Sequence, residues 1–215
     1  MEATRIIAVR HGETAWNVDA RIQGHIDIAL NERGRQQARK LGQALAGEAI
    51  GAVYSSDLGR AHETASAVAS LAGIPVVTDR GLRERCFGMF EGKTFDEIHA
   101  TWPDQAHSWR TRIPDWVPPE GGESLLQLRS RVGAVLHTLA ARHAGDQILV
   151  VAHGGVLDAL YRLATGQDVN SPRTWQLPNA AINRLLWTPD GFTLVGWSDT
   201  QHLDDHAPAD ETTPS

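Results

Sequence analysis

The stretch Ile6-Ile7-Ala8-Val9-Arg10-His11-Gly12-Glu13-Thr14 decides the fold that we expect for this chain. Its first four residues are apolar and stand between charged residues, which predicts a buried strand over residues 6–9. An arginine, a histidine and a glycine follow directly, so a cation and an imidazole stand at the carboxyl end of the strand. Because ligands bind at that end of the strands in open α/β sheets, we expect Arg10 and His11 to belong to a binding site.

A second stretch, residues 147–155, repeats this pattern. A run rich in β-branched residues over Ile148–Val151 predicts another buried strand, and His153 and Gly154 follow it. A single histidine after a strand is more often a hydrogen-bonded structural residue than a functional one. Two strands that each end in His-Gly, together with Arg10, instead favour one functional site built from both.

The rest of the chain alternates helical and strand patterns. Helices are expected from about Asn31 to Ala49, Leu58 to Ala72, Ser124 to Ala144 and Gly155 to Thr165, further strands over Ile50–Tyr54 and from Val76, and a hairpin of Ile182–Trp187 and Phe192–Trp197. This order predicts an α/β fold. We expect a three-layer sandwich whose mostly parallel central sheet is flanked by helices and carries an antiparallel hairpin at its C-terminal edge.

Arg60 lies in the first turn of the helix expected over residues 58–72, which Ser55, Ser56 or Asp57 is expected to cap. Cations are mildly disfavoured at a helix N-terminus because the helix dipole is positive there. The placement is favourable if the helix start and the arginine face the same anion. Otherwise Arg60 is an ordinary exposed arginine, and the residues alone leave both interpretations open.

The composition is that of one ordinary globular domain. The 215 residues are 41% hydrophobic and 21% charged, with a formal net charge of −6. This charge argues against a general nucleic-acid or anionic-membrane binder, so any anion site is expected to be a local cluster of basic residues. The single cysteine, Cys86, cannot form an internal disulfide, and the four apolar residues after Arg5 are too few for a signal peptide or a membrane span. We therefore expect one domain over residues 1–199, located in the cytoplasm.

Two segments depart from the regular pattern. Residues 93–122 form a cap insertion in which Trp102, Trp109 and Trp116 stand seven apart among prolines, which predicts a short helix and an irregular remainder. The tryptophans are expected either to form the core of this cap or to line a pocket. Residues 200–215 are polar, acidic and Pro-containing, and are predicted to be disordered. The oligomeric state is left open, with a homodimer as one option.

Six short motifs, each weak evidence alone, occur along the chain in a characteristic order. They are Arg10-His11-Gly12-Glu13-Thr14 with Trp16 and Asn17; Arg21-Ile22-Gln23-Gly24; Ser55-Ser56-Asp57-Leu58-Gly59-Arg60-Ala61 with Thr64-Ala65; Leu82-Arg83-Glu84-Arg85 before Gly88 and Glu91-Gly92; Gly121-Gly122-Glu123-Ser124; and Ala152-His153-Gly154-Gly155. From about residue 5 to about residue 200, the chain thereby resembles the phosphatase branch of the histidine phosphatase superfamily, which has the phosphoglycerate mutase-like fold.

This resemblance implies a phosphatase that acts through a phosphohistidine. His11 is expected to attack phosphorus in line, from a solvent-facing loop, while Arg10, Arg60 and His153 hold the phosphoryl oxygens. The chemistry agrees, because guanidinium groups bind phosphoryl oxygens in pairs and a neutral imidazole is a competent nucleophile near pH 7. The resemblance also implies four residues that assist or contact phosphate or substrate: Asn17, Gln23, Gly24 and Gly154.

Glu84 fits the remaining role, which is to protonate the leaving alkoxide and then to deprotonate the water that splits the phosphohistidine. Arg83 and Arg85 flank it, and the sequence leaves open whether they are its ion-pair partners. No residues have the spacing of metal ligands, no cofactor is expected, and the expected partner is a small phosphorylated metabolite. The role of His25 is left open.

Two other functions stay in consideration. A cofactor-dependent phosphoglycerate mutase has the same fold and core residues, but the stretch from Glu84 to His153 is shorter than we expect for mutases, and an acidic tail replaces their lysine-bearing end. A non-catalytic phospho-ligand binding module would usually have lost His11 or Glu84. We therefore expect a phosphomonoester hydrolase that acts on small phosphorylated metabolites.

Overall fold

A six-stranded sheet forms the centre of the computed structural model, which describes residues 2–204. The strand order is β3-β2-β4-β1-β5-β6, so the two strands that end in His-Gly are neighbours. The strands β1 to β4 are parallel, whereas β5 runs antiparallel to β1 and forms a hairpin with β6. The strands are β1 (Thr4–Arg10), β2 (Ala52–Ser55), β3 (Val76–Thr78), β4 (Gln147–Ala152), β5 (Ile182–Thr188) and β6 (Gly191–Asp199).

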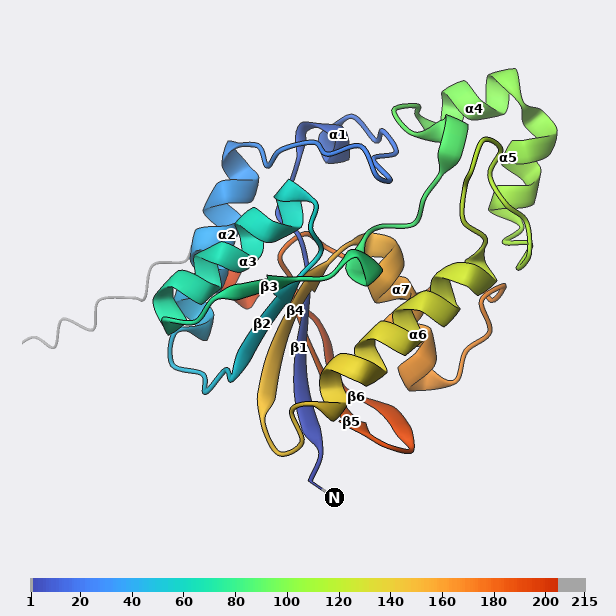
Figure 1. The fold of residues 1–215 in the computed structure, drawn as a ribbon. Helices are drawn as coiled ribbons and strands as arrows, with labels where there is room; N and C mark the ends of the chain where they lie inside the picture. Colours follow the sequence, from blue (N-terminus) through green and yellow to red (C-terminus); the bar gives the residue numbers. More distant parts are fainter. Residues whose placement is uncertain (1, 205–215) are drawn as a thin grey trace, which may run out of the picture.

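Helices cover both faces of the sheet in the three-layer arrangement that the sequence predicts (Figure 1). Alternate residues of the central strands point to opposite faces, so that Ile6 packs with α6 and α7 while Ile7 packs with α2 and α3. Because both faces are covered, every residue of β4 is buried. The predicted fold class is confirmed. The four covering helices are α2 (Glu32–Leu45), α3 (Gly59–Ala72), α6 (Leu125–Ala141) and α7 (Gly154–Thr165).

Most helix boundaries lie within a few residues of the prediction. The capping box of Ser124 and Gln127 opens α6 as expected. α2 and α6 end at Leu45 and Ala141, somewhat earlier than expected, because turns there return the chain to β2 and β4.

The predicted side-chain cap of α3 is wrong. Its N-cap is Leu58, which makes no side-chain cap hydrogen bond. Ser55 still belongs to β2, and Ser56 Oγ accepts a hydrogen bond from Leu58 N at 3.3 Å before the helix begins. The side chain of Asp57 binds Arg83 instead. The start of α3 is therefore held by tertiary contacts rather than by a local cap.

The cap insertion contains two helices, α4 (Phe95–Thr101) and α5 (Pro103–Arg110), and lies to one side of the sheet (Figure 1). Proline at the first position of α5 separates the two helices at Trp102. The ring centroids of Trp102, Trp109 and Trp116 lie 5.9, 6.0 and 6.2 Å from that of Phe90, which is fully buried. The tryptophans thus form the core of the cap, and Trp109 in addition lines a cleft beside it.

Short elements complete the described chain: α1 (Ala15–Val18), η1 (Arg80–Leu82), η2 (Gly88–Phe90) and η3 (Gln201–Leu203). The first part of the predicted disordered tail, residues 200–204, includes η3, which contacts α2. Lys40 Nζ donates to Leu203 O at 3.0 Å there. Residues 205–215 lie outside the described residues. Within residues 2–204, no helix is both long enough and apolar enough to cross a membrane.

Candidate active site

The parallel strands β1 and β4 bring His11 and His153 together. Arg10 is paired with Ala152 in the register of the two strands, so each histidine follows its strand at the same level of the sheet. The two imidazole ring centroids lie 5.2 Å apart, with the ring planes tilted by 59°. The repeated His-Gly pattern therefore correctly indicated that the two histidines lie side by side.

His11 is buried, which contradicts the expectation that it lies in a solvent-facing loop. Only 2% of the residue is exposed. Asn179 Nδ2 donates to the His11 carbonyl at 2.8 Å, and Gly12 N donates to Thr64 Oγ1 at 3.0 Å. Segments distant in sequence, including the one before β5, thus enclose the end of β1, and this long-range packing leaves no local signal in the sequence.

The hydrogen bond of the His11 ring fixes its tautomer. Nδ1 lies 2.7 Å from the carbonyl oxygen of Gly12, and a carbonyl only accepts hydrogen bonds, so Nδ1 carries the proton. Burial, followed by the charges of Arg10 and Arg60, holds the pKa of His11 well below its ordinary value. The ring is therefore neutral near pH 7, and its Nε2 carries a free lone pair.

Two arginines, the half-buried Arg10 and the fully buried Arg60, lie beside this ring. Arg10 Nη1 donates to Leu177 O at 2.7 Å, and Arg60 donates to the carbonyls of Ile26 and Gly24, both at 2.8 Å. Within the described structure, Nε of each arginine is buried without a hydrogen-bond partner. Burial lowers the pKa of both groups, although each stays a cation at neutral pH, and the charge of Glu84 opposes that shift in both. Arg60 lies in the first turn of α3, as predicted, with no part of its side chain exposed.

His153 occupies the N-cap position of α7 and is fully buried. Neither of its ring nitrogens has a hydrogen-bond partner in the described part of the protein. Its pKa is held well below the ordinary value by burial, then by Arg60, His11 and Arg10. A buried polar group without a partner costs about 1–3 kcal/mol. Four such atoms are found here, on Arg10, Arg60 and His153. Three N–H donors among them, the two arginine Nε–H groups and the one N–H of a neutral His153, would be satisfied by an anionic ligand with several acceptor oxygens.

The carboxylate of Glu84 lies at the start of α7. Gly155 N donates to its two oxygens at 2.9 and 3.2 Å, and Arg85 N donates to Oε1 at 2.8 Å. Neither flanking arginine pairs with it through a side chain: Arg83 binds Asp57 at 2.6 and 2.7 Å, and Arg85 Nε donates to a backbone carbonyl. The side chain of Glu84 therefore points into the site, as a functional carboxylate requires.

Comparison with known proteins identifies this arrangement. The protein-family model described as "Histidine phosphatase superfamily (branch 1)" matches residues 6–200 of this chain. The chain belongs to the histidine phosphatase superfamily. It is 38% identical to phosphoglycerate mutase-like protein 4 of Arabidopsis thaliana over 95% of this chain and 89% of that protein. It is also 38% identical to the metal-independent phosphoserine phosphatase of the same plant, over 94% of this chain and 84% of that one.

A solved structure agrees with this assignment to the superfamily. A mycobacterial glucosyl-3-phosphoglycerate phosphatase in complex with VO3 superposes with a TM-score of 0.82 at 32% identity, over 91% of this chain and 99% of that one. Histidine phosphatase superfamily proteins similar to this chain thus include phosphatases and phosphoglycerate mutase-like proteins.

The other residues predicted to contact phosphate or substrate are Asn17, Gln23, Gly24 and Gly154. Asn17 Oδ1 closes the capping box of α1 by accepting from Thr14 N at 3.0 Å. Gln23 is buried and its Oε1 has no partner among the described residues, whereas the carbonyl of Gly24 accepts from Arg60. A Cβ built on Gly154 would lie 3.6 Å from Arg10 Nε and 3.7 Å from Glu84 Oε2, so this glycine lies where the two groups approach each other. Their contacts with a substrate remain predictions.

A cleft of about 800 Å³ opens from this site toward the cap. Arg10, Glu84, Gly154 and Gly155 line its inner end. The aromatic side chains of Phe87, Phe95 and Trp109, and the basic side chains of Arg85, Arg110, Arg112 and Arg173, line its outer part. Asp158 also lines the cleft and forms an ion pair with Arg112 at 2.9 Å. The cleft is therefore walled by aromatic rings and has more arginines than carboxylates in its lining.

Sequence reasoning missed Arg85 and Asn179 as members of the site. Arg85 is 4% exposed, its Nη2 has no hydrogen-bond partner within residues 2–204, and burial lowers its pKa to about 10. Its position beside Glu84 was the available signal. Asn179 Nδ2 links the backbone of His11 to Asn17 Oδ1, at 2.8 and 3.2 Å, from an irregular segment that offers no periodicity to interpret. Within the described range, no three His, Cys, Asp or Glu side chains lie together as a metal site requires.

Proposed function

We propose that this protein is a phosphomonoester hydrolase that transfers the phosphoryl group of a small metabolite to His11 and then to water. One observation carries the proposal: the neutral His11 ring, with Nε2 free, lies beside Arg10, Arg60 and His153, each of which has at least one buried nitrogen without a hydrogen-bond partner among the described residues. A phosphoryl dianion supplies both the missing negative charge and the missing acceptors. The superfamily to which the chain belongs supports the same chemistry.

In the first step, the Nε2 lone pair of His11 forms a bond to phosphorus while the bond from phosphorus to the ester oxygen breaks. Arg10, Arg60 and His153 hold the three non-bridging oxygens. Charge on these oxygens is stabilised by donors that are already fixed by the fold, which is the largest contribution available to such a transfer. The depressed pKa of His11 keeps its attacking form populated down to acidic pH.

Glu84 supplies the protons for both halves of the reaction. Its protonated form gives a proton to the leaving alkoxide, and the resulting carboxylate then takes a proton from the water that attacks the phosphohistidine. This second step returns His11 to its neutral form and releases inorganic phosphate. The contact of the carboxylate with Gly155 N, next to Arg10, favours this role over that of an ion-pair partner.

We further propose that the leaving group carries an acidic group of its own. Among the described residues the buried Nη2 of Arg85 has no hydrogen-bond partner, Arg173 is exposed, and both arginines line the cleft. Phosphoserine and glucosyl-3-phosphoglycerate, which appear in the names of the two phosphatases similar to this chain, both carry a carboxylate. Phe87 and Trp109 would cover the rest of such a leaving group.

Phosphoglycerate mutase activity is the second candidate, because one relative is named for it. Incubation of the purified protein with 3-phosphoglycerate and with phosphoserine, with inorganic phosphate and 2-phosphoglycerate both measured, separates the two. The hydrolase predicts phosphate release in proportion to substrate loss. Rapid formation of 2-phosphoglycerate with negligible free phosphate would make the mutase assignment correct.

A further inference from the structure

Glu84, the proposed proton donor, lies in a segment without regular secondary structure. Glu84 lies between η1 and η2, and residues 84–87 belong to no helix or strand. A carboxylate must lie within hydrogen-bond reach of the leaving oxygen, and a displacement of about 1 Å in an active site can cost about 100-fold in rate. Some other part of the protein therefore has to fix this segment.

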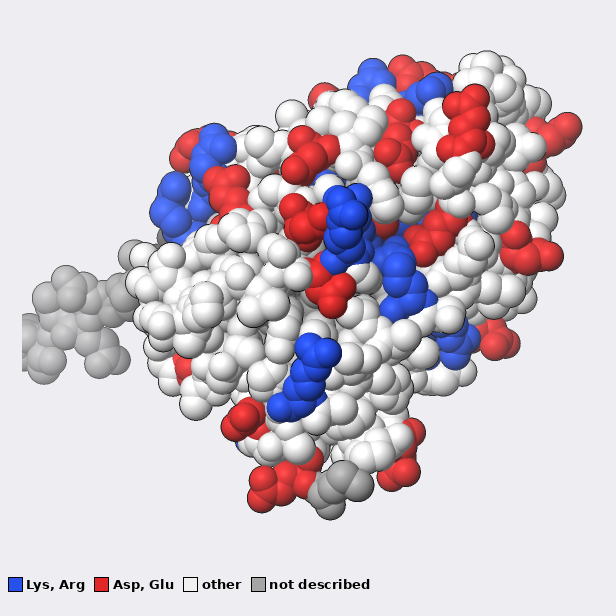
Figure 2. Space-filling view, in the orientation of Figure 1, with Lys and Arg blue, Asp and Glu red and all other residues white. Residues whose placement is uncertain are grey.

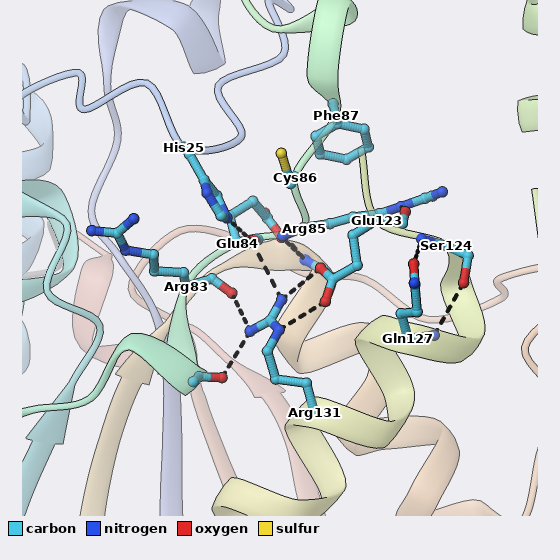
Figure 3. A network of polar contacts seen from close by, with 12 residues as sticks. His25, Arg83, Glu84, Arg85, Cys86, Phe87, Glu123, Ser124, Gln127 and Arg131 are labelled. Carbon is cyan, nitrogen blue, oxygen red and sulfur yellow. Dashed lines mark hydrogen bonds and ion pairs between the residues drawn. The ribbon is translucent and has the colours of Figure 1, made fainter. Parts of the chain in front are cut away.

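Arg131, on α6, makes the contacts that do so (Figure 3). Its Nη1 donates to the carbonyls of Gly81 and Arg83 at 2.8 and 2.9 Å, and its Nη2 lies 3.5 Å from the carbonyl of Glu84. All three carbonyls belong to the segment that ends at the proposed proton donor. One guanidinium thus replaces the hydrogen bonds that a helix or a sheet would have provided.

Glu123 fixes the orientation of this guanidinium. Its two carboxylate oxygens accept from Arg131 Nε and Nη2 at 2.8 and 2.7 Å, a fork-to-fork pair that sets the plane of the group. The side chain of Arg131 is 26% exposed and that of Glu123 is 15% exposed. The charge of Arg131 is therefore paired with Glu123 rather than with Glu84. Basic and acidic side chains adjoin one another near the middle of the face that Figure 2 shows.

His25 holds the same carbonyl from the opposite side. Its Nε2 lies 2.8 Å from Glu84 O, and therefore donates to it. His25 N in turn donates to Glu91 Oε1, which also accepts from Phe87 N at the other end of the irregular segment. The main chain at Glu84 is thus held between α6 and the loop over residues 20–31, while its carboxylate is held by Gly155 N.

We propose that Arg131, oriented by Glu123 and supported by His25, is a positioning residue that places the Glu84 carboxylate for proton transfer. None of these three side chains needs to touch substrate for this role. The proposal rests on the proposed function, because it assumes that Glu84 acts as the proton donor. It predicts that damage to the network affects proton transfer to the leaving group more than attack by His11.

The test compares two substrates with different leaving groups. Arg131→Met keeps the apolar part of the side chain and removes the guanidinium hydrogen-bond donors. Arg131→Lys keeps the positive charge but lacks the two-nitrogen geometry that pairs with Glu123. We compare kcat/KM, which reports phosphorylation of His11 alone, because hydrolysis of the phosphohistidine is common to both substrates. We expect kcat/KM of Arg131→Met to fall roughly 10- to 100-fold on an alkyl phosphate such as phosphoserine and less than about 3-fold on nitrophenyl phosphate, whose leaving group needs little protonation. Arg131→Lys should recover part of the loss.

Arg184→Met is a matched control. Arg184 on β5, opposite Ile7 in the middle of β1, forms a two-point ion pair with Glu48, whose carboxylate also binds Gln147 at the start of β4. If Arg131 acts only through general stability, both variants will lower the urea midpoint and neither will show a preference between the two esters. That result would overturn the positioning role.

A double variant separates this proposal from the proposed function. If Arg131 acts through Glu84, then Arg131→Met in a Glu84→Gln background should cost nothing further on phosphoserine, and independent, multiplying losses would contradict the proposal. If Glu84→Gln lowers kcat/KM, which reports the phosphorylation step, equally on both esters, the proton-donor assignment is overturned and the positioning role with it. If Arg131→Met does not fold, His25→Leu replaces it, because it removes the hydrogen-bond donor on the other side of the Glu84 carbonyl. His25→Leu is expected to impair the reaction of phosphoserine more than that of nitrophenyl phosphate, with a smaller loss than Arg131→Met. Equal losses on the two esters would again contradict the positioning role.

Discussion

His11 and His153 lie with ring centroids 5.2 Å apart, each buried and each with its pKa held well below the ordinary histidine value. One ring has a hydrogen bond that fixes its proton, and the other has no partner within the described structure. The difference fits the two roles proposed for them, attack on phosphorus and contact with a phosphoryl oxygen. Two neutral histidines in one buried site also have a consequence for stability.

The free energy of unfolding should decrease as the pH falls from about 7 to about 5. Below pH 6.5 the unfolded chain binds protons at both histidines while the folded protein does not, so each contributes a slope of up to about 1.4 kcal/mol per pH unit. His153→Gln should reduce this slope in urea unfolding measured between pH 5 and 8. Because burial also lowers the pKa of His202, some slope should survive even when both site histidines are replaced. A wild-type stability that is flat across this range would contradict the burial of both rings.

Gly155→Ala should impair catalysis with little change in folding. A Cβ at Gly155 would overlap Oε1 of Glu84, so the carboxylate must move from the position that Gly155 N holds. We expect a loss of at least about 10-fold in kcat on phosphoserine. Gly133→Ala in α6 is the control, because its Cβ would lie 3.6 Å from Leu163 Cδ1, an ordinary contact. The control should keep full activity and gain about 0.5–1 kcal/mol of stability. Full activity of Gly155→Ala would show that the observed position of the Glu84 carboxylate does not matter.

Arg85→Met should discriminate between substrates by the charge of the leaving group. Loss of a hydrogen bond between charged groups, about 1.5–3 kcal/mol, corresponds to roughly a 10- to 100-fold lower kcat/KM on phosphoserine. Nitrophenyl phosphate, which has no acid on its leaving group, should be affected much less. Equal losses on the two substrates would mean that Arg85 acts only by holding the carbonyl of Glu123, to which its Nε donates at 2.7 Å.

Turnover should survive incubation with EDTA. In the proposed mechanism Arg10 and Arg60 supply the positive charge that a divalent cation supplies in metal-dependent phosphatases. The measurement is phosphate release before and after chelation, with and without added Mg²⁺ or Zn²⁺. Loss of activity that either metal restores would assign the charge stabilisation to a metal ion instead.

The elements with a clear period were predictable from the sequence, and the contacts between distant segments were not. The apolar runs before Arg10 and before His153 predicted two strands of a mostly parallel sheet that contribute to one site, and the structure shows that these strands are parallel neighbours. The capping box at Ser124 was a purely local signal and was confirmed. The cap of α3 was predicted wrongly because tertiary contacts, including that of Asp57 with Arg83, replaced a local one.

The same division applies to the candidate site. The superfamily motifs indicated His11, Arg60 and Glu84, but the hydrogen bond to the His11 carbonyl comes from Asn179, which is 168 residues away. The partner of the Glu84 carboxylate, Gly155 N, is 71 residues away. Contacts between residues so far apart leave no pattern in a short stretch of sequence. The arginine-rich cleft and the Arg131 network were therefore found only in the structure.

Detection of the phosphohistidine tests the central claim most directly. Glu84→Gln enzyme should react with nitrophenyl phosphate because this leaving group needs little protonation, and should then accumulate the phosphoenzyme because the water that splits it lacks its base. Rapid quenching into alkali, where phosphohistidine is stable, followed by peptide mass spectrometry, gives the position of the group. We predict a nitrophenol burst close to one equivalent per chain, with one phosphoryl group on the peptide that contains His11 and none in Glu84→Gln/His11→Asn. A phosphoryl group on another residue, or an undiminished burst after the loss of His11, would contradict the mechanism.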